Sequence, residues 1–432
     1  MYNRSNLRRR RWNDDVLRRT LMKKRVVITG LGAVTPIGND VPSMWKGMMD
    51  GVNGIGKITR YDASSQKVQI AAEVKNLDPS QYLDERTASK LDRVIVLGIV
   101  AASEAYGDAN LTPESVDPYR FGTFVTSGIG GLNSIWNESQ VAMNRGKPDR
   151  ISPHFITNAI INLVGGNISM RFKAKGPNLP IVTACSASTN SIGEAFRYIR
   201  DGYLDVAFAG GSESSINELG IGGFAVMRAL NSGNDPMLAS MPFDKKRSGF
   251  VMGEGAGVLI LEEYDHAIAR GARIYAEVVG YGSTSDAFHV TAPDETAEGI
   301  TRCMQLALAD AGIAPEAIDY INAHGTSTPL NDKIETLGIK KTFGQHAYEL
   351  NVSSTKGMTG HMLGATGAVE SIACVLALVY QTVPPTITTT EPSDECDLNY
   401  TLGQPFKRKV DYTLNINLGF GGQNAALIFK KV

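Results

Sequence analysis

Three residues of the sequence have the chemical types and the settings that covalent and proton-transfer catalysis require. Cys185 follows an apolar stretch (LPIVTA) and precedes a helix with amphipathic spacing, which predicts a strand-turn-helix elbow at the thiol. The positive end of a helix dipole favours the thiolate, and the unpaired N–H groups there can hold an oxyanion. We expect Cys185 to be a nucleophile. The alternative is a buried, inert thiol, the interpretation that we give to Cys303 and Cys374.

His324 and His361 both lie in loops of small, polar and glycine residues. His324 ends an apolar segment and is followed by GTSTP, and His361 lies in KGMTGHMLGA, before a helix of small residues. Loops of this kind position functional groups on a rigid scaffold. A single histidine is more often structural than catalytic. Two of the six histidines in such loops, with a cysteine in a third, favour one shared site.

A glycine-rich segment, Asn417 to Gly422 (NLGFGG), follows the last predicted strand. Its glycines permit positive φ angles and close backbone approach, and Phe420 between them is a candidate movable lid. The alternative is a glycine-rich turn with a packed phenylalanine.

The elements that must position these residues alternate along the chain. Short apolar runs predict strands at 24–30, 121–126, 179–184, 204–210, 257–261, 318–323 and 413–417. Helical periodicity predicts helices at 92–107, 188–201 and 297–311. This alternation indicates a layered α/β fold. One strand leads to Cys185 and another to His324, so we expect a duplicated unit, 23–275 and 276–432, with its seam at 268–280.

Composition excludes several classes of protein. The 432 residues correspond to about three domains or one large fold with two halves. The net charge of -1 argues against global attraction to nucleic acid or an anionic membrane. Four separated cysteines without a CxxC pair favour a reducing, cytoplasmic compartment with no metal site. No run of about 18 uninterrupted apolar residues predicts a membrane span.

The first 22 residues differ from the rest in their excess of arginine. They lack the apolar core of a secretory signal. We interpret residues 1–22 as a disordered basic extension or an expression remnant ahead of a start at Met22, with an organelle transit peptide as the alternative.

Together these segments resemble the condensing enzymes of fatty-acid synthesis, in particular the β-ketoacyl-[acyl-carrier-protein] synthases of the second type. The resemblance runs from about Lys24 to Lys431. It also includes SGIGG at 127–131, PFD at 242–244, GFVMGEG at 249–255 and GYGS at 280–283. It implies the thiolase-like duplicated α/β fold with five αβαβα layers.

The resemblance also implies a reaction. Cys185 would accept an acyl chain from an acyl-carrier protein, and His324 and His361 would stabilise the enolate formed when malonyl-carrier protein loses carbon dioxide. The backbone N–H groups of Cys185 and Phe420 would form the oxyanion hole. Lys356 would tune charge and orient His361, and Glu335 would be a supporting carboxylate.

The resemblance also implies which residues bind the substrate. Thr326 and Thr328 would bond the phosphopantetheine arm, which arrives on the carrier protein, so that no cofactor is resident. Ile129 and Phe420 would gate the acyl pocket. The family is homodimeric. The chain departs from many relatives at Cys-Ser-Ala-Ser, where they carry Cys-Ala-Thr-Gly, and at Gly357, where serine is usual; these departures leave chain-length preference open.

Alternatives differ in specific residues. A papain-like protease needs a histidine that is oriented by an asparagine. A thiolase needs a second cysteine in the C-terminal glycine segment. A synthase of the third type has an asparagine in place of His361. A non-catalytic chain-length factor would lack Cys185. A polyketide ketosynthase shares the core segments and stays the main alternative.

Overall fold

The computed structural model describes residues 23–432, so the interpretation of residues 1–22 lies outside the described residues. Its strands follow the order β4-β5-β6-β1-β7-β13-β12-β8-β9. Their bounds are β1 Val26–Val34, β4 Phe121–Thr126, β5 Val206–Glu213, β6 Gly255–Glu263, β7 Ala276–Ser285, β8 Tyr320–Asn322, β9 Asn351–Ser353, β12 Tyr412–Gly419 and β13 Gln423–Lys430. Because β1 and β7 pair only at Val26, Val27 and Ile28, the strands form two sheets joined at one seam.

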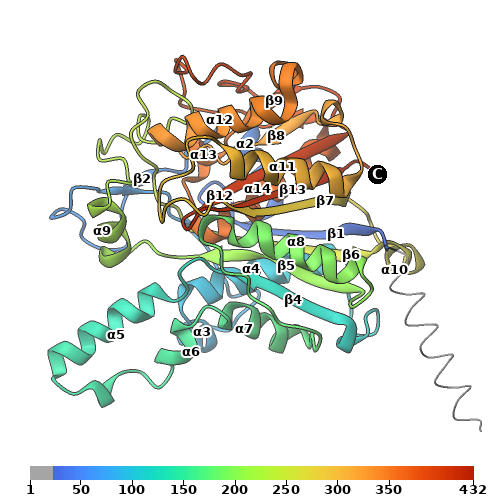
Figure 1. Ribbon diagram of the computed structural model, residues 1–432. Helices are drawn as coiled ribbons and strands as arrows, with labels where there is room; N and C mark the ends of the chain where they lie inside the picture. Colours follow the sequence, from blue (N-terminus) through green and yellow to red (C-terminus); the bar gives the residue numbers. More distant parts are fainter. Residues whose placement is uncertain (1–22) are drawn as a thin grey trace, which may run out of the picture.

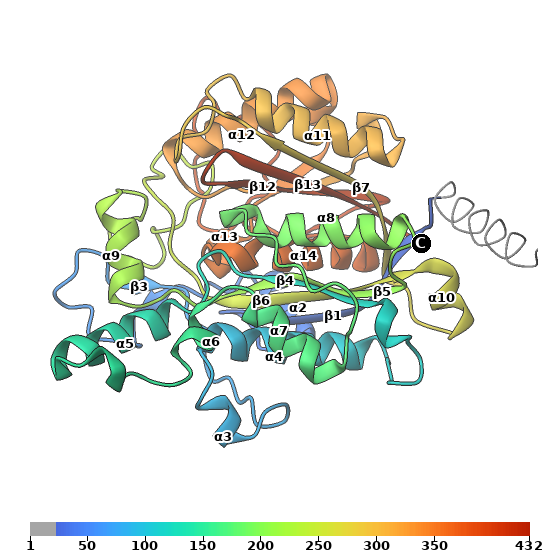
Figure 2. The ribbon, with the colours of Figure 1, turned by 60° about the horizontal axis from the view of Figure 1, so that its bottom comes forward.

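Helices cover both sheets and fill the space between them (Figures 1 and 2). The middle layer is α8 (Ala187–Arg200) and α14 (Thr366–Tyr380). One outer layer is α4 (Arg93–Asp108) and α7 (Leu163–Phe172), and the other is α11 (Glu298–Ala311) and α12 (Pro329–Phe343). Figure 2 shows the resulting order of helix, sheet, helix, sheet and helix. The expected five-layered thiolase-like fold is confirmed.

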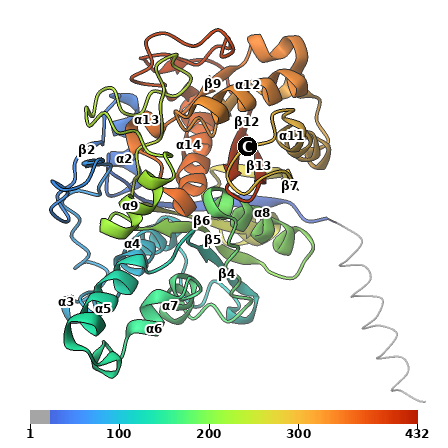
Figure 3. The ribbon, with the colours of Figure 1, turned by 60° about the vertical axis from the view of Figure 1, so that its left-hand side comes forward.

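The remaining helices and short strands lie around these five layers. They are α2 Val41–Met49, α3 Glu85–Ala88, α5 Leu132–Arg145, α6 Phe155–Ala159, α9 Glu218–Val226, α10 Tyr264–Ala269, α13 Lys356–Thr359, and the paired short strands β2 Gly56–Lys57 with β3 Ile70–Ala71 and β10 Thr382–Val383 with β11 Phe406–Lys407. Figure 3 shows α5 and α6 extending away from the sheets beside α7.

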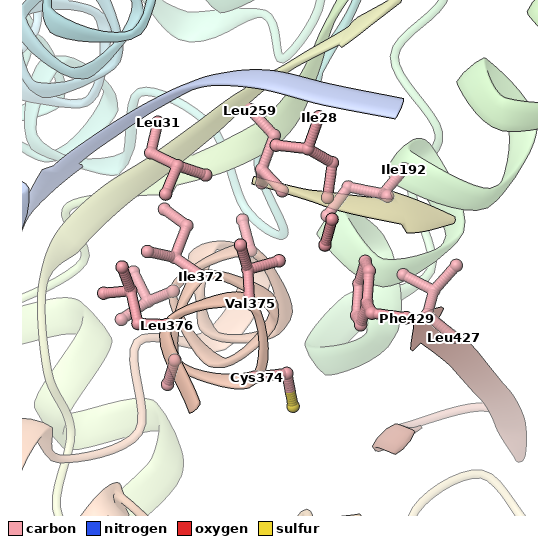
Figure 4. Packing of buried hydrophobic residues seen from close by; sticks show 14 of the residues in the cluster. Ile28, Leu31, Ile192, Leu259, Ile372, Cys374, Val375, Leu376, Leu427 and Phe429 are labelled. Carbon is pink, nitrogen blue, oxygen red and sulfur yellow. The ribbon is translucent and has the colours of Figure 1, made fainter. Parts of the chain in front are cut away.

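The middle layer is the centre of the apolar core (Figure 4). Ile372 and Val375 of α14 pack with Ile28 of one sheet and Phe429 of the other, and all four are fully buried. A helix enclosed in this way is apolar on most of its surface, and its buried polar side chains need partners. The stretch Leu363–Tyr380 is therefore long and apolar enough to cross a membrane, yet 89% of it is buried within the fold.

Most predicted elements are confirmed, and one is wrong. The three predicted helices correspond to α4, α8 and α11, and six predicted strands to β1, β4, β5, β6, β8 and β12. Residues 179–184 form no strand, and Ala184 already begins a short 3-10 turn. Pro180 has no N–H to donate, and the only bridge nearby joins Asn178 to Thr123 of β4. The polar, glycine-containing β7 was predicted only as a strand that starts near the seam, and β13, which follows the glycine segment, was not predicted.

Candidate active site

A cavity of about 360 Å³ joins the three predicted chemical residues. Cys185, His324 and His361 all line it, together with Phe420 from the glycine segment. The cysteine lies in the short turn just before α8, and the histidines follow β8 and α13, so both halves of the fold contribute. The predicted shared site is thus brought together by the fold.

The cysteine lies in a tight turn that the glycine segment approaches closely. Ala184, just before it, has a φ of 50°, a left-handed conformation that costs a non-glycine residue energy. A Cβ on Gly419 would lie 2.4 Å from the carbonyl oxygen of Thr183, so only glycine fits there. Gly421 and Gly422 have φ angles of 89° and 73°. The glycines of this segment therefore adopt the positive φ angles and the close backbone approach that were expected of them.

The expectation that the helix N-terminus favours the thiolate of Cys185 is wrong for the unliganded site. Burial raises the pKa of the thiol to about 12, although the charge of Lys356 and the backbone N–H of Phe420 act to lower it. Removing a thiolate from water costs more free energy than the helix dipole and the nearby donors give back. Cys185 is therefore a neutral thiol before substrate binds. Because the backbone N–H of Phe420 acts on the thiol, one proposed oxyanion donor lies on the same side of the cavity as the sulfur.

His324 is fixed through its backbone and its ring. Its N–H donates to Glu335 Oε1 at 2.5 Å, and the next N–H, of Gly325, donates to Glu335 Oε2 at 2.7 Å. Asn417 Nδ2 lies 3.3 Å from His324 Nδ1. An amide nitrogen can only donate, so His324 Nδ1 accepts and the ring proton lies on Nε2. Glu335 thus fixes the main chain at His324, and its part in the reaction stays a prediction.

His361 is held in a comparable way. Its N–H donates to the Val251 carbonyl at 2.7 Å, and its Nδ1 lies 3.0 Å from Thr366 Oγ1. The two histidine rings are 5.2 Å apart at an interplanar angle of 85°. Burial, with the charge of Lys356, lowers the pKa of both rings well below 6.5. Both are neutral, so each can donate an N–H and accept a bond at the other nitrogen.

Lys356 is a buried residue with an ion-pair partner, not a solvated surface lysine. Its Nζ lies 2.5 Å from Glu370 Oε1, and both side chains are 1% exposed. The other oxygen of Glu370 accepts a hydrogen bond from Asn417 Nδ2 at 2.7 Å. Lys356 is thus linked to the His324 ring through Glu370 and Asn417. This path leads to His324, whereas the role expected for the lysine was to orient His361.

Of the residues predicted to bind substrate or to gate the acyl pocket, Thr326, Thr328 and Phe420 line the same cavity. The hydroxyl oxygens of Thr326 and Thr328 are 2.9 Å apart. Phe420 is half-buried, with its ring 6.2 Å from that of Phe224. Ile129 is half-buried and does not line the cavity; it packs in an apolar cluster that contains Cys185.

Glu370, Asn417 and Thr366 complete the site, and sequence reasoning gave none of them a role. Glu370 had a detectable signal, because a single carboxylate in the apolar run GAVESIACVLALVY must find a partner when the helix is buried. Asn417 lies in the glycine segment that was singled out. Nothing local in the sequence joins either of them to Lys356 or His324.

Comparison with known families shows to which protein family the chain belongs. The N-terminal domain model of β-ketoacyl synthases matches residues 23–267, and the corresponding C-terminal domain model matches residues 275–390. The chain belongs to the β-ketoacyl synthase family. The division at 275/276 stays a prediction.

Curated relatives in this synthase family are similar along nearly the whole chain. The chain is 49% identical over 412 residues to "3-oxoacyl-[acyl-carrier-protein] synthase 2" of Synechocystis, covering 95% of this chain and 99% of that protein. It is 48% identical to the protein of the same name from Coxiella burnetii, with the same coverage. For Staphylococcus aureus the identity is 47%, over 94% of this chain and 98% of the relative.

Solved β-ketoacyl synthase structures share the architecture. A synthase from Burkholderia phymatum superposes with a TM-score of 0.88 at 33% identity, and the ishigamide ketosynthase/chain length factor with 0.89 at 33%. A ketosynthase in complex with its type II polyketide acyl-carrier protein gives 0.87 at 32%. Each match covers 95% of this chain and 100% of the other.

The two departures of this synthase from many relatives have structural contexts. Ser186 Oγ lies 2.8 Å from the Thr183 carbonyl oxygen and 3.0 Å from that of Gln423, so its hydroxyl can donate to either. A Cβ on Gly357 already meets the Ile387 carbonyl oxygen at 3.0 Å, so a larger residue there would press on this neighbour. Neither departure removes a group from the cavity.

Proposed function

We propose that the chain is a 3-oxoacyl-[acyl-carrier-protein] synthase of the second type. It condenses malonyl-carrier protein with an acyl chain held on Cys185, with loss of carbon dioxide, and lengthens fatty acids by two carbons. The observation that carries this proposal is the 47–49% identity to curated enzymes of this name over almost their whole length. The convergence of Cys185, His324 and His361 on one cavity supports it.

The first step is transfer of the acyl group. The Cys185 sulfur attacks the thioester carbonyl, the backbone N–H groups of Cys185 and Phe420 stabilise the oxyanion, and the carrier thiol leaves with the proton that Cys185 loses. The neutral thiol of the resting site fits this order, because deprotonation then accompanies attack. Thr326 and Thr328 bond the phosphopantetheine arm, which is part of the incoming substrate.

The second step is decarboxylation. The malonyl carboxylate leaves as carbon dioxide, and its electron pair forms an enolate on the thioester. His324 and His361 stabilise this oxygen by donating Nε2–H bonds. Asn417 keeps the His324 proton on Nε2, and Thr366 can do the same for His361 by donating to Nδ1. Neutral rings can fill this role, because each keeps one N–H donor and leaves its other nitrogen to accept the bond that orients it.

The third step forms the carbon–carbon bond. The enolate carbon attacks the acyl-Cys185 carbonyl, the oxyanion again binds the two backbone N–H groups, and the carbon–sulfur bond breaks. The Cys185 thiolate then takes up one proton, and 3-oxoacyl-carrier protein leaves. Ile129 and Phe420 move to admit the acyl chain. No resident cofactor or metal takes part in this scheme.

The protein partners in this proposal are acyl-carrier protein and a second copy of the chain. The carrier-bound ketosynthase among the structural relatives supports the first. The edge of the sheet at β4 supports the second, because Leu179 and Val182 beside it are 37% and 45% exposed. Four unpaired, buried cysteines favour a reducing cytoplasm. Light scattering on the purified chain would give the number of subunits.

A polyketide ketosynthase is the second candidate, since two structural relatives have polyketide or ketosynthase/chain-length-factor titles. Their identity of 32–33% is well below that of the fatty-acid enzymes.

The test is release of labelled carbon dioxide from malonyl-carrier protein, with and without a saturated acyl-carrier primer. Release coupled to a 3-oxoacyl product is expected. Release without condensation would keep the histidine site and contradict the Cys185 step. No release would favour a non-catalytic partner, and condensation only with oxidised polyketide primers would favour the second candidate.

A further inference from the structure

Glu213, the last residue of β5, is a fully buried carboxylate that the proposed chemistry does not use. Its Oε1 accepts bonds from the hydroxyls of Ser127 and Ser215, both at 3.0 Å. Its Oε2 accepts bonds from the backbone N–H groups of Gly128 at 2.8 Å and Gly364 at 3.1 Å. Among residues 23–432 it has no ion-pair partner within 4.0 Å. Four donors thus satisfy one buried charge.

Two of these contacts fix the backbone on both sides of Ile129. The Gly128 N–H is held by Glu213 itself. The Gly130 N–H donates to Ser127 Oγ at 2.9 Å, and that hydroxyl in turn donates to Glu213. The main chain of the proposed gate is therefore anchored, and Ile129 is left to move by rotation of its side chain.

The contact with Gly364 links Glu213 to a second segment beside Cys185, opposite the Ile129 turn. Gly364 follows Leu363, which has a φ of 43°, a conformation unfavourable for leucine without support. Leu363, Ile129 and Cys185 belong to one apolar cluster. A Cβ on Gly364 would lie 2.1 Å from the Gly128 nitrogen, so the two segments meet backbone to backbone over the carboxylate. His361 lies three residues before Gly364 on the same segment.

We propose that Glu213 is a positioning residue that sets acyl-chain selectivity by holding the Ile129 turn and the Leu363–Gly364 turn as one rigid wall beside Cys185. The inference rests on the proposed function, in that the space bounded by these residues takes the acyl chain. While the wall is anchored, a long chain enters only when Ile129 changes rotamer. When the anchor is weakened, the main chain of the turn also yields, and long chains gain more than short ones.

Glu213→Gln tests this with little change in volume. A glutamine keeps one acceptor oxygen and puts an NH2 group in place of the other, so either the Gly128 and Gly364 N–H groups lose their acceptor or the Ser127 and Ser215 hydroxyls must turn round to accept. In both arrangements the backbone bonds to a carboxylate are lost or become weaker bonds to a neutral amide. The probes are N-methyl and N-dodecyl iodoacetamide, and the measurement is the rate of Cys185 alkylation by intact mass. The ratio of the dodecyl rate to the methyl rate should rise about tenfold, the effect of losing roughly one net hydrogen bond.

Glu254→Gln is the matched control. Glu254 is also fully buried, but its carboxylate accepts from Arg60, Arg93 and Ser214 and touches neither turn. This variant should lose stability and keep the parental ratio. Ser127→Ala is a second test variant, which keeps the carboxylate and frees the Gly130 N–H; its ratio should shift in the same direction, and it carries the test if Glu213→Gln does not fold.

An unchanged ratio in a folded Glu213→Gln protein, or an equal shift in Glu254→Gln, would overturn the inference. Alkylation needs no carrier protein and no condensation. A parent protein that fails to condense would therefore count against the proposed function, while the alkylation ratio still decides the role of Glu213.

Discussion

The two sides of Cys185 are built from different interactions. On the histidine side, polar side chains fix one another directly, as in the path from Lys356 through Glu370 and Asn417 to His324. On the acyl side the walls are apolar, and Ile129 packs against its neighbours without a side-chain hydrogen bond. There, the polar contacts hold the main chain and leave the side chain free to change rotamer.

This difference suits the two tasks. Enolate stabilisation needs donors at fixed positions, because a preorganised donor costs no reorganisation during the reaction. An acyl pocket must instead admit chains of different length, and apolar side chains can move without breaking hydrogen bonds. The two sides should therefore fail separately when they are altered.

The largest effect is expected from Cys185→Ala. No covalent acyl-enzyme should form, and condensation should fall by about 10⁴-fold or more, since loss of a nucleophile removes the whole covalent path. Decarboxylation of malonyl-carrier protein should continue, because the histidine side is intact. Intact mass and carbon dioxide release measure the two. A variant that still becomes acylated would refute the nucleophile assignment.

His324→Ala and His361→Ala should give the opposite pattern. Each removes one donor to the enolate oxygen and should slow decarboxylation by about 10²–10³-fold. Acylation of Cys185 by an acyl-carrier primer should persist, because neither substitution changes the backbone N–H groups of the oxyanion hole. Parental decarboxylation rates in both variants would contradict the enolate argument.

Sequence patterns predicted the elements and the three chemical residues, because those signals are local. The strand 121–126 is an apolar run, and helix 92–107 has a clear period. The turn and the helix at Cys185 were located correctly, although the predicted strand before them does not form. The direction of the pKa shift of Cys185 was wrong, since burial depends on residues far along the chain. The roles of Glu370 and Glu213 could not be predicted for the same reason: their partners are distant in sequence and meet only in the folded core.

Stability should next depend on the buried pair of Lys356 and Glu370. Glu370→Gln leaves the lysine charge buried without its carboxylate, which costs about 3–5 kcal/mol of unfolding free energy. Urea unfolding measures this. Asp50→Asn, which breaks the exposed pair with Lys46, is the control and should change stability by less than about 1 kcal/mol. Equal losses would show that Lys356 does not depend on its partner.

The histidine side should also make stability sensitive to acid. Burial and Lys356 depress the pKa of His324 and His361 below 6.5, so the unfolded chain binds more protons than the folded one below that pH. Their contribution is therefore intact above pH 6.5 and is lost as the pH falls. Melting temperatures between pH 7.5 and about 5 should fall less steeply in a His324→Asn/His361→Asn protein than in the parent. Parallel curves would contradict neutral, buried rings.

The smallest effect is expected where the two sides meet, at Ser186. Its hydroxyl can bond the carbonyl of Gln423, the residue just after the glycine segment, and Thr189 of α8 bonds Asn417 at the start of that segment. The segment is therefore held at both ends. Ser186→Ala frees only the Gln423 end and should slow acylation of Cys185 about threefold to tenfold, the effect of a neutral hydrogen bond of about 1 kcal/mol.

Ser191→Ala is the control for this change. Ser191 is a buried serine of α8 whose hydroxyl has no hydrogen-bond partner among residues 23–432, so acylation should stay at the parental rate. Decarboxylation should be unchanged in both variants, because Asn417 still holds the His324 ring. If Ser186→Ala slowed decarboxylation as much as acylation, the glycine segment would act on both sides of the cysteine, and the separation between them would be incomplete at this point.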